Sequence, residues 1–350
     1  MNTCVGLKIT IEKLKHSWYV YKGMEKAGGI AKKSLVLAAV FAVTSASTIG
    51  VIHLIDRWSR PRQEPVKAAA ISDPRWTQLT AELESTVARY PGRVGVYLKD
   101  LNSDRIWSHQ PDQLMPSASL IKVPIMAAVL KKVEEGEISL EENLTVTRKT
   151  RAGGSGRLKW ARAGSKFTVA ELLYYLITES DNTAMRLLIA RLGLDYFQNA
   201  FSELGLLATN IENEGLKLSS RPVLKENYTT AREMAELLEK IYEGQLVTKE
   251  SSGIMLELMK HLKHRERLAR TLPSGWQIAH KTGLLRRACH DAGIVFSPSG
   301  DYVLVVLTWK GPDYRTAKRY ISYLGQVTYR YYSGESDLAT SYPRSRVQGI

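Results

Sequence analysis

The chain has little of what builds metal, redox or disulfide-linked sites. Its 350 residues include only two cysteines and seven histidines. Cys4 and Cys289 belong to no CxxC pair, and the histidines lack the spacing of metal ligands. No glycine-rich loop that could cradle a phosphate follows a predicted strand. These absences argue against a metal site, a dithiol redox site and a nucleotide-binding loop, so we expect no metal and no cofactor.

Positive charge is abundant but unevenly placed. The formal net charge is +14, from 49 Lys and Arg and 35 Asp and Glu. Residues 1–62 hold ten basic and three acidic side chains, a balance of +7, and the other 288 residues hold 39 and 32, which is also +7. Membrane topology and anionic lipid explain the excess near the N-terminus. The rest of the chain is only mildly basic, so we expect no nucleic-acid binding.

One long stretch carries no formal charge, from Leu35 to Ile55. At about 1.5 Å of rise per residue, its 21 residues just span a bilayer core of about 30 Å. The stretch predicts a single transmembrane anchor at residues 35–55, with the lysine-rich residues 1–34 in the cytoplasm by the positive-inside rule. The alternative is a cleaved signal peptide, because Thr44-Ser45-Ala46 offers small residues to a peptidase. Cys4 and Cys289 would lie on opposite sides of the membrane, which excludes a disulfide between them.

The remainder of the chain divides into three parts. Residues 56–75 contain arginines and prolines and predict a linker, and residues 76–335 are long enough for one domain with a full core. Residues 336–350 form a serine-containing tail that we expect to be mobile. We therefore expect a cell-membrane protein with one span, whose domain faces the periplasm or the extracellular space.

The order of predicted elements in the domain indicates its fold class. Two strands near its start are followed by a helical middle, and three strands return late, with Ser297-Pro298-Ser299-Gly300 as a turn between the last two. This order predicts an α+β fold with three α/β/α layers, in which helices pack on a five-stranded antiparallel sheet, plus an all-helical subdomain. A cleft would lie between the two parts. The predicted strands are 94–98, 104–107, 277–280, 292–296 and 302–308, and the predicted helices include 77–90, 168–178, 182–192, 230–242 and 314–329.

Three short strings carry the chemistry: Ser119-Leu-Ile-Lys122, Ser180-Asp181-Asn182 and Lys281-Thr282-Gly283. If a helix begins at Ser119, Lys122 lies on the same face one turn along. The apolar run that follows, residues 123–130, predicts a buried helix. Burial would lower the pKa of the Lys122 amine, so it could take the proton of the Ser119 hydroxyl during attack on a carbonyl carbon.

The other two strings supply partners for that attack. Ser180 would relay a proton to the leaving nitrogen between Lys122 and Lys281. Asn182 would hold a substrate amide, whereas Asp181 would brace its loop. Each string alone also has an ordinary interpretation, since SDN can simply cap a helix and KTG can end a strand.

The third string and the helix start would hold the substrate. Lys281 and Thr282, on a strand at the sheet edge, would bind its carboxylate, and Gly283 would let its backbone approach. The backbone N–H of Ser119, at the start of a helix, would stabilise the oxyanion.

In this order the strings resemble those of class A β-lactamases and the wider family of penicillin-recognising serine hydrolases. The similarity covers roughly residues 76–335 and extends around the strings. It implies a β-lactamase/transpeptidase-like fold, a Ser119 acyl-enzyme and a second oxyanion donor, the N–H of Leu284. The flanking segments are Met115-Pro-Ser-Ala-Ser119-Leu-Ile-Lys122-Val-Pro-Ile, Thr178-Glu-Ser180-Asp-Asn182-Thr-Ala and Ala279-His280-Lys281-Thr282-Gly283.

The resemblance weakens in the segment that corresponds to the omega loop, about residues 206–228. Class A enzymes carry a glutamate there, with an asparagine four residues on, to hold the water that hydrolyses the acyl-enzyme. No ExxxN occurs here, and Glu214 lies nearest the expected place, with Glu212 second. Either could instead be a solvated loop carboxylate. Without that glutamate, acylation survives while release of the acyl group slows.

The segment after Gly283 also departs from the family. Leu284 replaces the small or hydroxyl residue that often stands there, so Arg286 or Arg287 is a candidate clamp for the substrate carboxylate. The alternative is a pair of solvent-facing arginines. Cys289 is either a reactive thiol near the cleft or a buried small side chain.

Three functions follow from these residues. The first is a membrane-anchored, monomeric class A-type β-lactamase that confers antibiotic resistance. The second keeps the nucleophile but acts on cell-wall peptides, as a D,D-peptidase, amidase or esterase. The third is a penicillin-binding sensor that is acylated without turnover.

Overall fold

We describe a computed structural model of the chain, which covers residues 73–212, 225–285 and 287–334. The chain divides into two units, Met1–Pro74 and Arg75–Ile350. The predicted anchor at 35–55, nearly all of the predicted linker and the tail at 336–350 lie outside the described residues. Among the described helices, none combines the length and the apolar character that a membrane span requires.

The centre of the domain is a five-stranded antiparallel sheet with the order β2-β1-β9-β8-β7. This confirms the predicted sheet. β7 runs on to Leu285, beyond the predicted end at His280, so that Lys281-Thr282-Gly283 lies inside a strand at the sheet edge. The strands are β1 (Arg93–Asp100), β2 (Ile106–His109), β7 (Gln277–Leu285), β8 (Ala288–Phe296) and β9 (Tyr302–Trp309).

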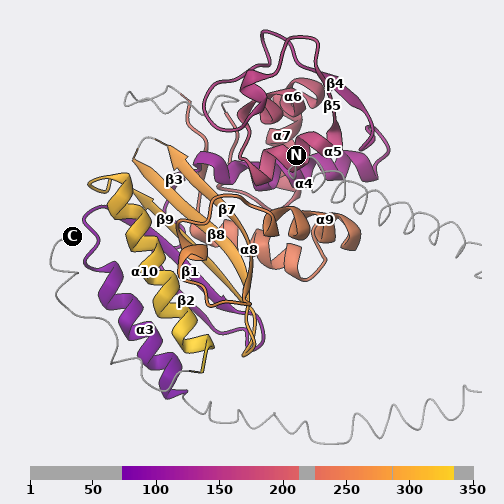
Figure 1. Ribbon diagram of the computed structural model, residues 1–350. Coiled ribbons are helices and arrows are strands. Elements are labelled where there is room, and N and C mark those ends of the chain that lie inside the picture. The colour runs from indigo at the N-terminus through magenta and orange to yellow at the C-terminus, as the bar shows by residue number, and fades with distance from the viewer. Residues whose placement is uncertain (1–72, 213–224, 286, 335–350) are drawn as a thin grey trace, which may run out of the picture. The chain divides into compact units, whose positions relative to one another are not determined.

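Two helices from opposite ends of the domain cover one face of this sheet (Figure 1). They are α3 (Pro74–Val87) and α10 (Tyr314–Tyr332). Each presents an apolar stripe at helical spacing, as residues three and four apart face the same side. The stripes bury Leu79 and Leu83 of α3 and Ile321 and Leu324 of α10 completely. This apolar layer fixes the sheet against its helices.

The remaining helices form the other layer and the helical subdomain (Figure 1). Residues 123–130 of α4 are apolar and all buried, as the sequence predicts. α8 and α9 pack directly on the sheet. The helices of this part are α4 (Lys122–Glu134), α5 (Val169–Thr178), α6 (Asn182–Leu192), α7 (Leu194–Glu203), α8 (Ala231–Tyr242) and α9 (Lys249–Lys260), with the short 3-10 turns η1 (Ala118–Ile121), η2 (Leu158–Trp160) and η3 (Leu268–Arg270).

Side-chain caps set where several of these helices begin. Thr168 and Glu171 form a reciprocal capping box at α5, and Thr230 accepts a hydrogen bond from the N–H of Glu233 at the start of α8. Asp181 caps α6. The predicted helix starts at 168, 182 and 230 therefore agree with the structure to within one residue.

Two pairs of short strands complete the described fold. β3 (Met115–Pro116) pairs with β6 (Tyr228–Thr229), and β4 (Asn143–Thr145) pairs with β5 (Lys166–Thr168). The N–H of Ser117 extends the first pair by donating to the carbonyl of Asn227 at 2.7 Å. The chain just before Ser119 is thus bonded directly to the end of the predicted omega loop.

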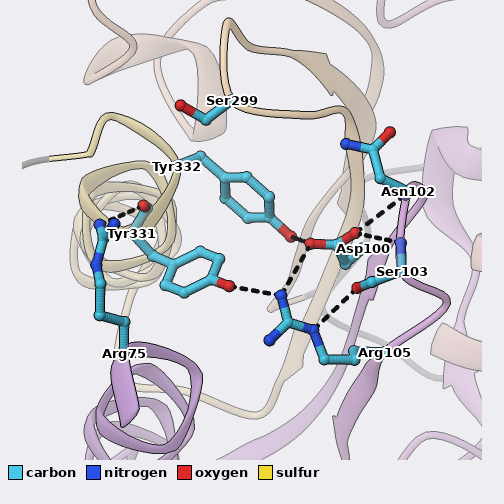
Figure 2. A pocket seen from close by; sticks show the side chains of 8 residues that line it. All are labelled: Arg75, Asp100, Asn102, Ser103, Arg105, Ser299, Tyr331 and Tyr332. Atoms are coloured by element: carbon cyan, nitrogen blue, oxygen red, sulfur yellow. Dashed lines mark hydrogen bonds and ion pairs between the residues drawn. The ribbon is translucent and has the colours of Figure 1, made fainter. Parts of the chain in front are cut away.

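A polar network closes the far end of the β1–β2 hairpin against α10 (Figure 2). The Asp100 carboxylate accepts from the N–H of Ser103 at 2.8 Å and from the Tyr332 hydroxyl at 3.1 Å. Arg105 donates to the Tyr331 hydroxyl at 2.6 Å. A hollow of about 230 Å³ opens beside these residues, and it contains none of the three strings. The network ties the hairpin to the helix.

The carboxylate of Glu233 organises the turn at the start of the predicted omega loop. It is 9% exposed and accepts from the N–H groups of Leu207, Ala208 and Thr209, each at 2.7 Å. The Thr209 hydroxyl donates to it as well, at 2.6 Å. Four donors on one buried carboxylate hold this turn onto α8.

We expect Glu233→Gln to lower the free energy of unfolding by about 2–4 kcal/mol, because the amide nitrogen places donors against donors in a buried site. Urea unfolding of the variant measures this change. Glu236→Gln, on the exposed face of the same helix, is the control and should change stability by less than about 0.5 kcal/mol. Equal effects of the two variants would contradict the assignment.

Candidate active site

Ser119 lies in a tight turn where the chain passes from β3 into α4. Ala118 has a φ of +47°, in the left-handed region, and η1 then carries the chain into α4 at Lys122. The sequence predicts a helix from Ser119, whereas the structure begins with a 3-10 turn. Because a 3-10 turn has three residues, it also stacks position i+3 over position i. The Lys122 Nζ atom lies 3.4 Å from the Ser119 Oγ atom.

Ser180 stands between two amines. Its Oγ atom accepts from Lys122 Nζ at 3.1 Å and from Lys281 Nζ at 3.0 Å. Its φ of +54° turns the chain sharply before α6, and its carbonyl oxygen also accepts from Lys122. Ser119, Lys122, Ser180 and Lys281 are therefore brought together from one 3-10 turn, two helix starts and one strand.

The end of β7 forms the wall opposite the Ser119 turn. Thr282 is 5% exposed there, and its carbonyl oxygen accepts from Lys281 Nζ at 2.9 Å. A Cβ atom on Gly283 would lie 3.2 Å from both the Ala118 Cβ and the His290 Cδ2 atoms. Glycine at this position lets the strand approach the Ser119 turn closely.

Burial changes the charge state of both lysines. Lys122 is fully buried, and desolvation lowers its pKa to about 7, although the Asp181 carboxylate opposes this shift. Lys281 is also fully buried, and desolvation together with the charge of Lys122 lowers its pKa well below the ordinary value. Near neutral pH a large share of Lys122 is therefore an uncharged amine, which is able to accept a proton.

Asn182 and Asp181 are occupied by bonds within the protein. Asn182 accepts from Lys122 Nζ at 2.7 Å through Oδ1 and donates to the carbonyl of Gly153 at 3.0 Å through Nδ2. Asp181 accepts from the N–H groups of Thr183 at 2.8 Å and, through its other oxygen, of Leu158 at 2.8 Å. Asp181 thus braces its loop, as the sequence predicts, and Asn182 orients Lys122.

Two residues of the site are not evident from the sequence. His290 is fully buried, and its Nε2 atom donates to the carbonyl of Pro116 at 2.7 Å while Nδ1 accepts from the N–H of Thr308 at 3.1 Å. Burial lowers its pKa to about 4, so it is neutral and holds the chain just before the Ser119 turn. It lies opposite Gly283 in the sheet, and only the strand register could have revealed it.

The second is Arg267, which is 3% exposed. Its Nε and Nη1 atoms have no hydrogen-bond partner among the described residues, and its charge helps to lower the pKa of Lys281. It lies in a run of basic residues, 260–270, whose other members include exposed side chains. Composition alone does not distinguish it from those neighbours.

The structure does not bring every predicted residue to the cluster. Glu214 and Arg286 lie outside the described residues. Glu212 donates its N–H to Asn227 at 2.8 Å, and its carboxylate lies 3.6 Å from Lys225 Nζ. Leu284 lies in β7 opposite Cys289.

Two alternatives from the sequence are wrong. Arg287 is no carboxylate clamp, because it has a φ of +63° at the β7–β8 turn and its guanidinium donates to the carbonyls of Gly311 and Lys310. Cys289 is no reactive thiol, because it is fully buried and burial raises its pKa. Cys289 packs in the core, and Arg287 ties the β7–β8 turn to the segment after β9.

We expect Gly156→Ala to disrupt this site. A Cβ atom there would lie 2.0 Å from Asp181 Oδ2, at a φ of +92°. Gly164→Ala is the matched control, because its φ is +90° but a Cβ would meet nothing within 4 Å. Backbone strain should lower the free energy of unfolding by about 1 kcal/mol in both variants. Gly156→Ala should lower it by a further 1–3 kcal/mol, about the cost of overpacking.

Urea unfolding and the rate of capture of a fluorescent penicillin measure the two effects. Acylation should fall for Gly156→Ala alone, since displacement of Asp181 moves Ser180. Equal loss of stability in both variants would show that Asp181 does not fill the space beside Gly156.

Comparison with known proteins agrees with this geometry. The profile of the Beta-lactamase enzyme family matches residues 78–332. The chain is 25% identical to β-lactamase VEB-1 of Pseudomonas aeruginosa over 284 residues, which is 75% of this chain and 92% of that one. It is 27% identical to the extended-spectrum β-lactamase PER-1 of the same species over 271 residues, covering 72% and 87%.

Solved structures show the same likeness. A β-lactamase from Sphaerobacter thermophilus DSM 20745 matches with a TM-score of 0.68 at 29% identity, covering 74% of this chain and 98% of that one. PBP-A matches with a TM-score of 0.67 at 31% identity, covering 73% and 96%. A leucine-to-glutamate mutant of PBP-A, an acyl-enzyme complex with penicillin G, matches equally well, with a TM-score of 0.68. The resemblance found in the three strings is thereby confirmed, and this chain belongs to the β-lactamase enzyme family as a serine hydrolase of the class A β-lactamase-like kind.

Proposed function

We propose that the protein hydrolyses β-lactams through an acyl-enzyme on Ser119. The observation that carries this proposal is the amine of Lys122, whose Nζ lies 3.4 Å from Ser119 Oγ and whose pKa is about 7. Such an amine is neutral often enough to act as a general base at physiological pH. The β-lactam substrate is supported by the family and by the relatives VEB-1 and PER-1.

The reaction follows from the hydrogen bonds around Ser180. Ser119 Oγ attacks the β-lactam carbonyl carbon while its proton passes to Lys122. As the C–N bond breaks, the Ser180 hydroxyl gives its proton to the leaving nitrogen and regains one from Lys122 or Lys281, which lie 3.1 and 3.0 Å away. The N–H groups of Ser119 and Leu284 stabilise the oxyanion. Water then attacks the ester and returns a proton to Ser119.

The substrate carboxylate binds at the other side of the site. Lys281 and Thr282 are the partners predicted from the sequence. We propose Arg267 as the third partner, in the role of carboxylate clamp that the sequence suggested for Arg286 or Arg287. Arg267 is a buried cation whose Nε and Nη1 atoms have no partner among the described residues. A carboxylate that accepts from them would satisfy donors that are otherwise costly to bury.

A second candidate function is a D,D-peptidase, or a related amidase or esterase, that acts on cell-wall peptides. One observation favours it: in the described part of the chain, Ser119 and Lys122 form no hydrogen bond with a carboxylate, and Glu212 lies beside Lys225 instead. The likeness to PBP-A adds support. A sensor that is acylated without turnover is the third reading of the same site.

We also propose that residues 35–55 anchor the protein in the cell membrane, with the hydrolase domain outside the cytoplasm. Support comes from the sequence alone, through the uncharged run and the lysines that precede it. A cleaved signal peptide would place the same domain outside without an anchor. N-terminal sequencing of the mature protein from membranes separates the two.

Capture of a fluorescent penicillin tests the nucleophile. Wild-type protein should form a covalent adduct, and Ser119→Ala should form none, because the other hydroxyl beside Lys122, that of Ser180, is assigned to proton transfer and not to attack. Ser155→Ala, on an exposed loop near the site, is the control and should be labelled normally. An adduct of Ser119→Ala at wild-type yield would refute the assignment.

Turnover separates the three functions. A burst followed by steady nitrocefin hydrolysis supports the first, and Glu214→Gln should then slow deacylation while leaving the burst intact. A stable adduct without hydrolysis supports the second or third. Release of D-alanine from a pentapeptide selects the second.

The pH dependence of acylation tests Lys122. Since the neutral amine is the base and its pKa is about 7, the acylation rate should fall about tenfold per pH unit below 7 and level off above it. Stopped-flow measurement with a fluorescent penicillin from pH 5 to about 9 gives the profile. A flat profile would rule out a titrating base.

A further inference from the structure

A strongly basic stretch connects β4 to β5. Residues 148–166 contain seven Lys and Arg and no Asp or Glu. Six of the seven are exposed, and within the described part of the chain only Arg157 pairs with a carboxylate, that of Glu179. The seven are Arg148, Lys149, Arg151, Arg157, Lys159, Arg162 and Lys166. Most of this charge is therefore not neutralised by the protein itself.

This stretch is fixed against the active site. The N–H of Asn182 donates to the carbonyl of Ser155 at 3.1 Å, and its side chain donates to the carbonyl of Gly153 at 3.0 Å. The Asp181 carboxylate accepts from the N–H of Leu158 at 2.8 Å. η2, in the middle of the stretch, packs on α6, which is labelled in the upper part of Figure 1. The middle of the stretch, residues 153–158, is thus held against the loop that carries Ser180.

An aromatic ring projects from the same stretch. Trp160 is 80% exposed, and Lys159 Nζ lies 5.4 Å from its ring centroid. Single exposed apolar residues are common, but an exposed tryptophan among cations, on a segment that packs on the loop of Ser180, has the composition of a binding surface. The ring offers apolar area, and the surrounding cations offer partners for anions.

A second segment next to the loop of Ser180 is also basic. Lys263, His264 and Arg265 are exposed in the segment between α9 and β7. Lys263 and Arg157 both bind the carboxylate of Glu179, the residue directly before Ser180. Positive side chains therefore border the site from two segments that are distant in the sequence.

A simple β-lactam such as penicillin G carries one carboxylate, which leaves this surface without a partner. The proposed partners of that carboxylate are Lys281, Thr282 and Arg267. Further cations beside the site attract a substrate with further carboxylates, and a field of one sign at the mouth of a cleft raises the rate of encounter. Trp160 can pack against the apolar atoms between those carboxylates.

We propose that residues 148–166, with Trp160, are an accessory surface that binds the acidic part of a cell-wall peptide whose terminal amide reaches Ser119. This basic rim selects an acidic peptide over an uncharged one of the same length. The inference rests on the proposed acyl-enzyme function, and it names the substrate class of that site.

Two fluorescein-labelled peptides that end in D-alanyl-D-alanine test the rim. One carries two side-chain carboxylates, and the other carries the corresponding amides. Fluorescence anisotropy measures their binding to the full-length Ser119→Ala protein in detergent at low salt. The acidic peptide should bind about tenfold more tightly, and this difference should shrink at high ionic strength.

Variants locate the effect. The triple change Arg148→Gln, Lys149→Gln and Arg162→Gln should remove most of the preference for the acidic peptide. Trp160→Ala should weaken the binding of both peptides by about the same factor. The matched control removes the same charge from exposed positions on the α3 and α10 side of the sheet: Arg89→Gln, Arg315→Gln and Arg319→Gln. This control should keep the preference for the acidic peptide within about twofold of the value for the protein without these changes.

Two results would overturn the inference: equal binding of the two peptides to the protein, or equal loss of preference in the rim and control variants. Equal peptide binding together with rim-dependent binding to vesicles that contain phosphatidylglycerol would assign the rim to a membrane surface. Penicillin capture by rim variants that retain Ser119 is measured separately and should be normal. Failure of that capture in the wild type would count against the acyl-enzyme alone, because peptide preference is measured without it.

Discussion

Two lysine amines buried around one serine hydroxyl are the constraint on which this site depends. The described hydrogen bonds of Lys122 and Lys281 all go to hydroxyl, amide and carbonyl oxygens, and none goes to a carboxylate. Neutral acceptors offset only part of the cost of burying a charge, so the pKa values of both amines fall. A carboxylate at hydrogen-bond distance would keep Lys122 an ammonium ion. Lys122 can therefore act as a base because its surroundings lower the pKa of its amine.

The two reactive hydroxyls are held at strained corners of the backbone. Ala118, next to Ser119, has a φ of +47°, and Ser180 itself has a φ of +54°. Such conformations cost about 1 kcal/mol or more each and persist only where the surroundings impose them. Three features supply that support here: the apolar helix α4, the capped start of α6, and neutral His290, which bonds the chain just before the Ser119 turn. Rigid elements on both sides keep hydroxyls and amines within hydrogen-bond reach.

Much of the fold and of the site could be predicted from the sequence, because apolar periodicity, caps and spaced strings are local signals. The pairing of Ser119 with Lys122 needs only one helical turn. Other features depend on the register of distant strands. The apolar pattern ended β7 at His280, whereas the strand continues to Leu285. The guanidinium of Arg287 binds backbone carbonyls at a tight turn, and Arg267 and His290 are buried by the assembled tertiary structure. Burial of a charged residue is a property of tertiary structure that local sequence does not encode.

The central claim is that burial converts Lys122 into a base, and a direct titration tests it. Proteins grown with ¹³Cε-labelled lysine report each amine by NMR, and the signal that is lost in Lys122→Arg identifies this residue. We predict that its chemical shift titrates with a pKa near 7, as the structure indicates. A titration near the ordinary value of 10.5 would contradict the account, since the amine would then be charged near neutral pH and could not accept the proton of Ser119.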